Sequence, residues 1–300
     1  MSGGATASLR LIIFVVMAEK RKVKILKSTG EKVDFSLEKL KNGLSAAGAN
    51  REQVKEIAEE VERKIYDGIT TQQIYKLAYS LLRKKRSHKT AGRYRLKKAI
   101  FELGPSGFPF EIFVGKLFES FGYNVKMDVM MEGKCVQHEV DVVASKDNTL
   151  VIVESKFRSD YRGKTNVQVP LYIHSRFNDI KEKLKDDSKY ANYTIRGFVV
   201  TNARFTTDAI KYAECAGLGL ISWDYPSKSS LKYYIDRSGL HPVTSLHTLR
   251  KQEKQLLLEK GIVLCSQLSE NKDLLEEAVM DDEKVKKVLD EAELIVRSDP

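Results

Sequence analysis

The chain has 300 residues, of which 42% are hydrophobic and 31% charged, so it can form the cores of about two domains and is not a disordered tail. Its three widely separated cysteines exclude a disulfide scaffold and a cysteine-rich zinc module, and they favour a reducing compartment. The net charge of +10 comes mainly from the first third of the sequence, which favours a polyanionic partner such as nucleic acid or a nucleotide.

The amino terminus contains an apolar run at residues 9–17 that is too short to span a bilayer. A secretory signal carries its positive charges before the apolar run, whereas here Lys20, Arg21 and Lys22 follow it. We therefore expect the chain to begin in effect at Met17, with residues 1–17 as a non-native or disordered extension. No other segment is apolar enough to cross a membrane, so we expect a cytoplasmic protein without a membrane partner.

The first domain is expected at residues 18–104. Alternating residues on both sides of a turn at 28–30 predict a small hairpin, and Ser36 is placed to cap a helix that closes at Gly48. Apolar residues at helical spacing predict further helices at 51–66, from 70 or 71 to 81, and at 90–103. Glycines and prolines at 104–109 then mark a linker.

The second domain is expected at residues 105–245. The pattern predicts a helix at 110–121, strands at 139–144 and 150–157, and a helix at 169–184. A strand at 196–201, a helix at 206–216 and a strand at 218–223 follow. Strands that alternate with helices predict an α/β sheet covered on both faces. From residue 246 to 300 the pattern is wholly helical.

The two strands at 139–144 and 150–157 bring charged residues together. A tight turn at Asp147-Asn148 would place Asp141 opposite Glu154, and Glu139 opposite Lys156. Residues two apart share a face of a strand, and so do directly opposed residues. We therefore expect these four side chains to form one patch, while the intervening residues point into the core, namely Val140, Val142, Val151 and Val153.

Carboxylates that lie so close raise one another's pKa unless a cation intervenes. A divalent metal such as Mg²⁺ resolves the conflict, activates water and stabilises charge on a phosphoryl group. The alternative is a solvated edge hairpin in which Glu139 and Lys156 form an ordinary cross-strand pair. Charges at the end of an otherwise buried strand favour the site, because α/β sheets usually place their sites there.

These segments resemble a nuclease family. Asp141, followed by Glu154-Ser155-Lys156 in LVIVESKF, is similar to the PD-(D/E)XK motif of restriction-endonuclease-like folds, and within them to the Mrr-like branch. FPFEIFVGKLFESFGYNV and VVTNARFTTDAIKYAECAGLGLISWD extend the resemblance over residues 108–225. The resemblance implies that Asp141 and Glu154 bind Mg²⁺ or Mn²⁺, with Glu111 as an accessory ligand. It also implies that Lys156 orients water or phosphate, and it gives Gln168 an accessory place. Glu139, which the strand register adds to the patch, is a further accessory residue.

Residues 23–103 resemble the ATP-cone, a nucleotide-sensing module. The resemblance is carried by KVKILKSTGEKVDFSLEKL, IYDGITTQQIY and RYRLKKAIFELG. It implies a regulatory ATP or dATP site in which Lys27 and Lys39 contact phosphates, with further contacts from Val33, Ser36, Leu40 and Thr71. Ser28 stands where the family usually has an arginine. No GxxxxGK motif occurs, so hydrolysis by a P-loop is not expected.

Two further segments have open interpretations. Residues 83–98 are rich in Lys and Arg and contain no acid, so they are either a nucleic-acid clamp or a solvated helix end. Residues 246–300 are similar to helix-hairpin-helix or SAM-like modules, although their acidic balance equally favours a protein contact. His138 adjoins the candidate site but should point to the opposite face from Asp141.

The expected fold class is α+β multidomain: a mostly helical ATP-cone domain with a small hairpin, an α/β restriction-endonuclease-like domain with a central mixed sheet, and a small helical C-terminal module. The expected function is a Mg²⁺-dependent DNA endonuclease regulated by ATP or a deoxynucleotide. The alternatives are a nucleotide-responsive DNA-binding regulator with a catalytically silent nuclease fold, and an RNA nuclease. Homo-oligomerisation stays open.

Overall fold

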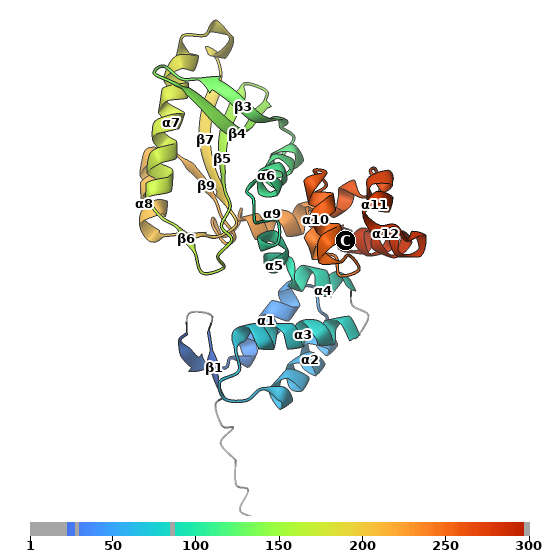
Figure 1. Ribbon diagram of the computed structural model, residues 1–300. Helices are drawn as coiled ribbons and strands as arrows, with labels where there is room; N and C mark the ends of the chain where they lie inside the picture. The colour runs from blue at the N-terminus through green and yellow to red at the C-terminus, as the bar shows by residue number, and fades with distance from the viewer. Residues whose placement is uncertain (1–22, 28–29, 85–87, 297–300) are drawn as a thin grey trace, which may run out of the picture.

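The computed structural model describes residues 23–27, 30–84 and 88–296 (Figure 1). The expected extension at residues 1–17, the expected start at Met17 and the departure at Ser28 lie outside these residues. In Figure 1 the amino-terminal domain, the domain with the large sheet and the carboxy-terminal helices form three groups around helices α4 and α5.

The amino-terminal domain consists of a two-stranded hairpin and a group of helices. Strand β1 (Lys24–Leu26) pairs antiparallel with β2 (Lys32–Asp34), as the sequence predicts. Ser36 accepts a hydrogen bond from the backbone of Lys39 and so caps α1 (Leu37–Ala46). The domain continues through α2 (Arg51–Lys64), α3 (Thr71–Lys84) and α4 (His88–Tyr94). Its separate hydrophobic core includes Leu44, Ile57, Val61 and Leu82, all fully buried.

The helix expected at 90–103 is divided at Arg95 into α4 and α5 (Leu96–Phe101). The division follows the packing of the two halves. Ala91 of α4 lies in the core of the amino-terminal domain, whereas Leu96 and Ile100 of α5 lie in the core of the following domain. The two helices therefore form the bridge between two separate cores.

The central domain is built on a mixed five-stranded sheet with the order β3-β4-β5-β7-β9. Strands β3 (Asn124–Glu132), β4 (Gln137–Lys146) and β5 (Thr149–Lys156) are antiparallel. Strands β5, β7 (Thr194–Thr201) and β9 (Gly219–Ile221) are parallel. Strand β3 is absent from the sequence prediction, and it lies at the sheet edge next to β4. A small parallel pair, β6 (Lys164–Thr165) and β8 (Arg204–Phe205), lies beside the sheet.

Helices cover both faces of this sheet. Helix α6 (Phe108–Ser120) packs on one face, and α7 (Gln168–Lys185) with α8 (Thr207–Ala216) covers the other (Figure 1). The core on the α6 side contains Phe110, Phe113, Val142 and Val153. This arrangement confirms the expected mixed sheet between helices.

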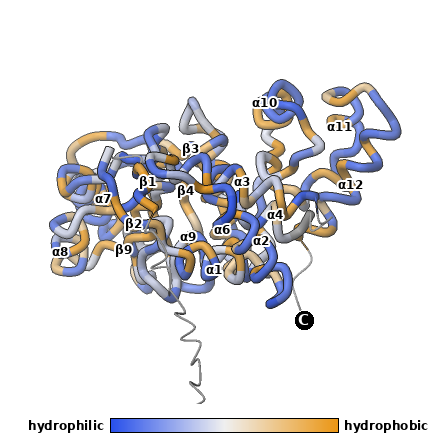
Figure 2. The backbone as a smooth tube through the Cα atoms, turned by 90° about the horizontal axis from the view of Figure 1, so that it is seen from below, coloured by the Kyte–Doolittle hydropathy of each residue, from blue (hydrophilic) through white to orange (hydrophobic). Residues whose placement is uncertain are grey.

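From residue 246 onward the chain is helical, as expected. It forms α10 (Lys251–Glu259), α11 (Lys272–Val279) and α12 (Asp282–Val296), together with short 3-10 turns. Helix α9 (Leu231–Ser238) precedes this segment and is absent from the sequence prediction. Hydrophobic and hydrophilic residues alternate along α10, α11 and α12 (Figure 2). Their apolar side chains share one continuous core with α5 and α6. Helix α12 also packs against α4, where Ile295 lies so close that a Cβ at Gly92 would be 2.7 Å from its Cδ1 atom.

The α+β multidomain fold class is confirmed by these three parts. Across the described residues, the helices are too short or too polar to cross a membrane.

Candidate functional site

Carboxylates meet where β4 and β5 stop pairing. The register between the two strands is the one predicted, since Val142 faces Val153 and Lys146 faces Thr149. Pairing ends at Val142, so Asp141 and Glu154 lie just past the last paired residues. Asp141 Oδ2 accepts a hydrogen bond of 2.6 Å from the backbone N–H of Ser155, which fixes its carboxylate against the end of β5.

The carboxyl groups at this strand end perturb one another. Burial, together with repulsion from Asp141, raises the pKa of Glu154 to about 7. Glu111, in the first turn of α6, has a pKa raised to about 7 by burial and by repulsion from Asp141 and Asp128. Burial also raises the pKa of Asp141, against the hydrogen bond from Ser155. The site therefore concentrates negative charge that a bound cation would stabilise.

Asp128 belongs to this group although the sequence analysis does not place it there. It lies in the middle of β3 with a φ of 50°, and it has no paired residue on β4 while its neighbours Met127 and Val129 do. A positive φ is uncommon for an aspartate. The signal that could have found it is the alternation of β3 itself, which puts Asp128 opposite Asp141.

Arg176, in the middle of α7, was also missed. Its Nη1 atom donates to Glu154 Oε2 at 2.8 Å, and its Nη2 atom donates to the backbone carbonyl of Glu139. Both side chains of the Arg176–Glu154 pair are only 16% exposed. The guanidinium also lies 5.6 Å from the ring centre of Tyr172, one helical turn earlier. Arg176 thus connects α7 to both strands of the hairpin.

Lys156 and Gln168 line one cavity of about 350 Å³ beside the carboxylates. Lys156 is half-buried, and its backbone carbonyl accepts a hydrogen bond of 2.6 Å from Thr201 on β7. Gln168 is exposed at the start of α7, with Asn166 hydrogen-bonded to it. The other residues of the cavity are Glu154, Arg158, Asn166, Val169, Tyr172 and Ile173.

Several expectations about this hairpin need correction. Strand β5 is the middle strand of the sheet, so the alternative of a solvated edge hairpin is wrong. Glu139 is exposed and is not among the residues of β4 paired with β5, because that pairing ends at Val142. Val140 is buried on the α7 side with Ile152, whereas the other three valines face α6.

His138 has a structural partner. Its Nε2 atom lies 2.8 Å from Asp179 Oδ2 on α7, and Asp179 also accepts hydrogen bonds from the backbone of Cys135 and Val136. Hydrogen bonding by His138 and Cys135 lowers the pKa of Asp179 to about 2. This group holds the β3–β4 turn against α7, away from the carboxylates.

The donor chemistry of the site fits a hard divalent cation. Asp141 and Glu154 offer carboxylate oxygens, which Mg²⁺ prefers, and Glu111 faces the same negative region. Within the described residues, no group of three His, Cys, Asp or Glu side chains is already arranged to hold a metal ion. Glu154 instead pairs with Arg176, so metal binding here requires this carboxylate to be shared or released.

A second cavity, of about 240 Å³, lies in the amino-terminal domain. It is lined by all six residues that the sequence analysis assigns to nucleotide binding, namely Lys27, Val33, Ser36, Lys39, Leu40 and Thr71. Lys39 is exposed in the first turn of α1, where free backbone N–H groups favour an anion. Lys27 is paired with Glu31 at 2.9 Å. Tyr75 and Tyr94 also line the cavity, and the sequence analysis does not name them.

The basic stretch at 83–98 is partly used inside the protein. Arg95 pairs with Glu102 at 2.5 Å, and Lys98 lies 3.3 Å from the same carboxylate. Lys97 lies 5.9 Å from the ring centre of Trp223. These contacts leave fewer cations for a nucleic-acid clamp than the sequence pattern offers.

Three family models match successive parts of the chain. The ATP cone domain model matches residues 23–100, the restriction endonuclease model matches 105–225, and the AF1548-like C-terminal model matches 241–296. The expected fusion of an ATP-cone to a restriction-endonuclease-like domain is thereby confirmed. The resemblance of the last segment to helix-hairpin-helix or SAM-like modules stays a prediction.

Sequence and structure comparisons give several similar proteins. An uncharacterized protein of Archaeoglobus fulgidus is 29% identical over 184 residues, which are 61% of this chain and 99% of that protein. The crystal structure of AF1548, a protein of unknown function, has 28% identity and a TM-score of 0.52 and covers 64% of this chain and 98% of its own. MspJI restriction endonuclease in complex with a 27-mer oligonucleotide has 9% identity and a TM-score of 0.33, over 67% of this chain and 39% of its own.

Proposed function

We propose that this chain, which joins an ATP-cone, a restriction-endonuclease-like domain and an AF1548-like C-terminal domain, is a divalent-metal-dependent DNA endonuclease regulated by ATP or dATP. The observation that carries the proposal is the meeting of Asp141, Glu154 and Lys156 at the end of the hairpin, next to Glu111. The restriction endonuclease match over residues 105–225 supports it.

Each residue has a role in this proposal. Asp141 and Glu154 hold the metal, and Glu111 supplies an accessory oxygen from α6. Bound Mg²⁺ or Mn²⁺ stabilises charge on the scissile phosphate and lowers the pKa of a water ligand. Asp141 is already oriented by the backbone of Ser155. Lys156 extends into the cavity beside the carboxylates, where its ammonium orients the phosphate or the attacking water.

The cavity beside Lys156 also indicates how the DNA backbone is held. Arg158 and Asn166 line it together with Gln168 and the exposed Tyr172, which is 64% accessible. Guanidinium and amide groups are the usual partners of phosphate oxygens. We therefore place the phosphate that neighbours the cleavage site in this cavity, with Gln168 as an accessory polar group, whereas Glu139 does not line it.

The regulatory part of the proposal rests on the cavity of the amino-terminal domain. In this proposal, Lys27 and Lys39 contact the phosphates of ATP or dATP, and Val33 and Leu40 contact its apolar parts. Ser36 and Thr71 supply hydroxyl groups on opposite sides. The ATP cone domain match over residues 23–100 supports this assignment.

The test is cleavage of supercoiled plasmid with Mg²⁺ or Mn²⁺, with and without ATP or dATP. Lys156→Ala should lower the rate by about 10²–10⁴-fold, the range of a positioned acid–base group. Lys185→Ala is the matched control, since Lys185 pairs with Glu182 at the far end of α7. Full activity of Lys156→Ala would reject the proposed site, and cleavage of RNA but not DNA would correct the substrate.

A specific observation favours the second candidate function, a DNA-binding regulator with a silent nuclease fold. The Arg176–Glu154 ion pair engages one of the two main metal ligands with a side chain of the same protein. This candidate predicts that the protein shifts DNA on a gel in a nucleotide-dependent manner but does not cut with any metal.

A further inference from the structure

The bridge between the two cavities begins at the nucleotide cavity. Tyr75 and Tyr94 line that cavity, and their rings stack at 5.0 Å with an interplanar angle of 11°. The Tyr75 hydroxyl donates a hydrogen bond of 3.2 Å to the backbone carbonyl of Tyr94. Because Tyr94 is the last residue of α4, a ligand that moves either ring acts directly on the junction between α4 and α5.

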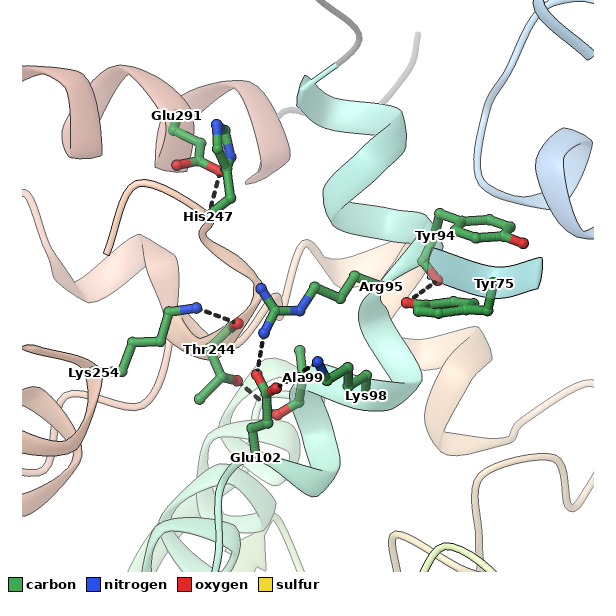
Figure 3. A network of polar contacts seen from close by, with 10 residues as sticks. All are labelled: Tyr75, Tyr94, Arg95, Lys98, Ala99, Glu102, Thr244, His247, Lys254 and Glu291. Carbon is green, nitrogen blue, oxygen red and sulfur yellow. Dashed lines mark hydrogen bonds and ion pairs between the residues drawn. The ribbon is translucent and has the colours of Figure 1, made fainter. Parts of the chain in front are cut away.

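The next residue, Arg95, connects this junction to the far end of α5. Its guanidinium pairs with Glu102 at 2.5 Å, so the ion pair spans the helix from one end to the other (Figure 3). Arg95 is only 14% exposed at its side chain. Such a pair connects the two ends of α5, and removing either partner would leave a largely buried charge.

Helix α5 is fixed on its other side by the carboxy-terminal helices. Thr244 Oγ1 donates a buried hydrogen bond of 2.6 Å to the carbonyl of Ala99 on α5. Lys254 Nζ donates to the carbonyl of Thr244 at 3.0 Å (Figure 3). Leu96 and Ile100 are fully or almost fully buried, so α5 is packed into the same core as the carboxy-terminal helices.

The far end of α5 touches the loop that follows the catalytic strand. Phe101 stacks on Tyr161 with ring centres 4.0 Å apart and an interplanar angle of 17°. Gly104 lies against the ring of Phe157, where a Cβ would be 2.4 Å from Cε1. Phe157 directly follows Lys156. Residues 157–163 therefore lie between the end of α5 and the candidate catalytic lysine.

We propose that the loop of residues 157–163 transmits nucleotide binding from the Tyr75–Tyr94 pair, through α5, to the position of Lys156. This inference rests on the proposed function and assigns the path of its regulation. The Phe101–Tyr161 stack is the variable contact of the path, because Tyr161 is 47% exposed on a loop, whereas Phe101 is buried with α5. The hydrogen bonds of Arg158 with Asn202, the residue that follows β7, hold the start of the loop, so we expect movement beyond it.

The experiment compares the full chain with Tyr161→Ala. Hydrogen exchange of residues 157–163 and the plasmid cleavage rate are each measured with and without ATP or dATP, and nucleotide affinity is measured by calorimetry. In the wild type we expect nucleotide to change both loop exchange and rate by about fivefold or more. In Tyr161→Ala the ratio of the cleavage rates with and without nucleotide should fall to about one, and so should the ratio for loop exchange. Nucleotide affinity and the cleavage rate without nucleotide should stay within about twofold of the wild type.

Two control variants separate the stack from a general loss of a tyrosine. Tyr161→Phe keeps the ring and should keep the nucleotide effect. Tyr233→Ala removes a comparably exposed tyrosine whose contacts are with Tyr234 and Arg237 on its own helix, and it should also keep the effect. A nucleotide effect of unchanged size in Tyr161→Ala would overturn the inference.

The readouts also distinguish failure of this inference from failure of the proposed function. In one outcome the protein binds nucleotide and cuts DNA, but nucleotide changes neither the loop exchange nor the cleavage rate. This outcome overturns the inference and retains the nuclease function. In a second outcome the protein never cuts DNA, but nucleotide changes the loop exchange of the wild type and of Tyr161→Phe and not that of Tyr161→Ala. This outcome supports the path and rejects the nuclease. Absence of nucleotide binding overturns the path and the regulatory part together.

Discussion

Glu291 is a buried carboxylate whose negative charge is stabilised by hydrogen bonds from another segment of the chain. Its oxygens accept hydrogen bonds from the backbone of His247 at 2.8 Å and of Thr248 at 3.0 Å, and from the His247 ring. Burial acts to raise the pKa of Glu291, but these hydrogen bonds outweigh it and hold the pKa below its usual value. The ionised side chain thereby joins α12 to the segment before α10.

This geometry predicts how stability depends on pH. A carboxyl with a lowered folded pKa contributes stability above its unfolded pKa, and the contribution disappears as pH falls through the folded pKa. Glu291→Gln should therefore lower the free energy of unfolding at pH 7 by about 1–3 kcal/mol. As the pH falls from about 4.5 to the lowered folded pKa of Glu291, the difference in unfolding free energy between the variant and the wild type should shrink.

Urea unfolding at pH 7 and below pH 4.5 measures both differences. Glu270→Gln, at an exposed glutamate, is the control and should change neither. A loss of equal size at both pH values would contradict the assigned role of the ionised carboxylate.

At the residue scale, the candidate catalytic set was predictable only in part. Asp141, Glu154 and Lys156 follow from a turn position and the period of two along a strand, which are local properties. Arg176 comes from a helix 22 residues after Glu154, and its reach depends on how α7 crosses the sheet. Such a crossing is a property of tertiary packing, and no local spacing encodes it.

At the scale of elements, the segment from α5 to α6 packs against Phe157, the residue that follows β5. Gly104 lies so close to the ring of Phe157 that a Cβ atom at residue 104 would clash with it. The centre of the Phe157 ring also lies 5.7 Å from that of Phe110 on α6. The absence of a side chain at residue 104 therefore lets the ring of Phe157, the residue after Lys156, pack between Gly104 and α6. Any added atom must displace Phe157.

Gly104→Ala should lower the cleavage rate by about 10–100-fold, because a small displacement of a reacting group is costly. Nucleotide affinity should not change, since residue 104 packs against Phe157 and does not line the nucleotide cavity. The double variant Gly104→Ala with Phe157→Leu makes room for the methyl group and should recover part of the rate. Plasmid cleavage by purified variants of verified fold is the measurement, and wild-type rates for Gly104→Ala would contradict the packing argument.

The elements themselves were mostly predictable, and the exceptions have physical causes. The helix expected at 90–103 divides at Arg95, because its two halves pack into different cores. Strand β3 has the alternation of a half-buried strand, but as an edge strand it lacks the fully buried run that marks a central strand, and so it was missed. Edge strands carry a weaker pattern than central ones such as β5.

At the scale of the whole molecule, the chain has separate hydrophobic cores that include different numbers of helices and strands. The core of the amino-terminal domain extends from Ile25 to Ala91. The core that begins at Leu96 includes residues of α5, α6, the sheet and every carboxy-terminal helix. The central domain and the carboxy-terminal helices are therefore expected to unfold together, and the amino-terminal domain by itself.

Scanning calorimetry of the full chain should accordingly show two transitions. ATP at about 100 times its dissociation constant should stabilise the amino-terminal transition by about 2.7 kcal/mol. The transition of the larger unit should shift much less. A single transition, or equal shifts in both, would contradict the division into two cooperative units.

The contact between α12 and α4 has a consequence for how the molecule is assembled on the ribosome. Helix α4 emerges early, but the surface that receives Ile295 beside Gly92 stays uncovered until the last of the described helices has been made. The amino-terminal domain can fold first, yet its orientation is set only when α12 arrives. Substitutions near residue 295 would therefore affect the orientation of a domain encoded about 200 residues earlier. Nascent chains would also expose apolar surface until synthesis of α12 is complete.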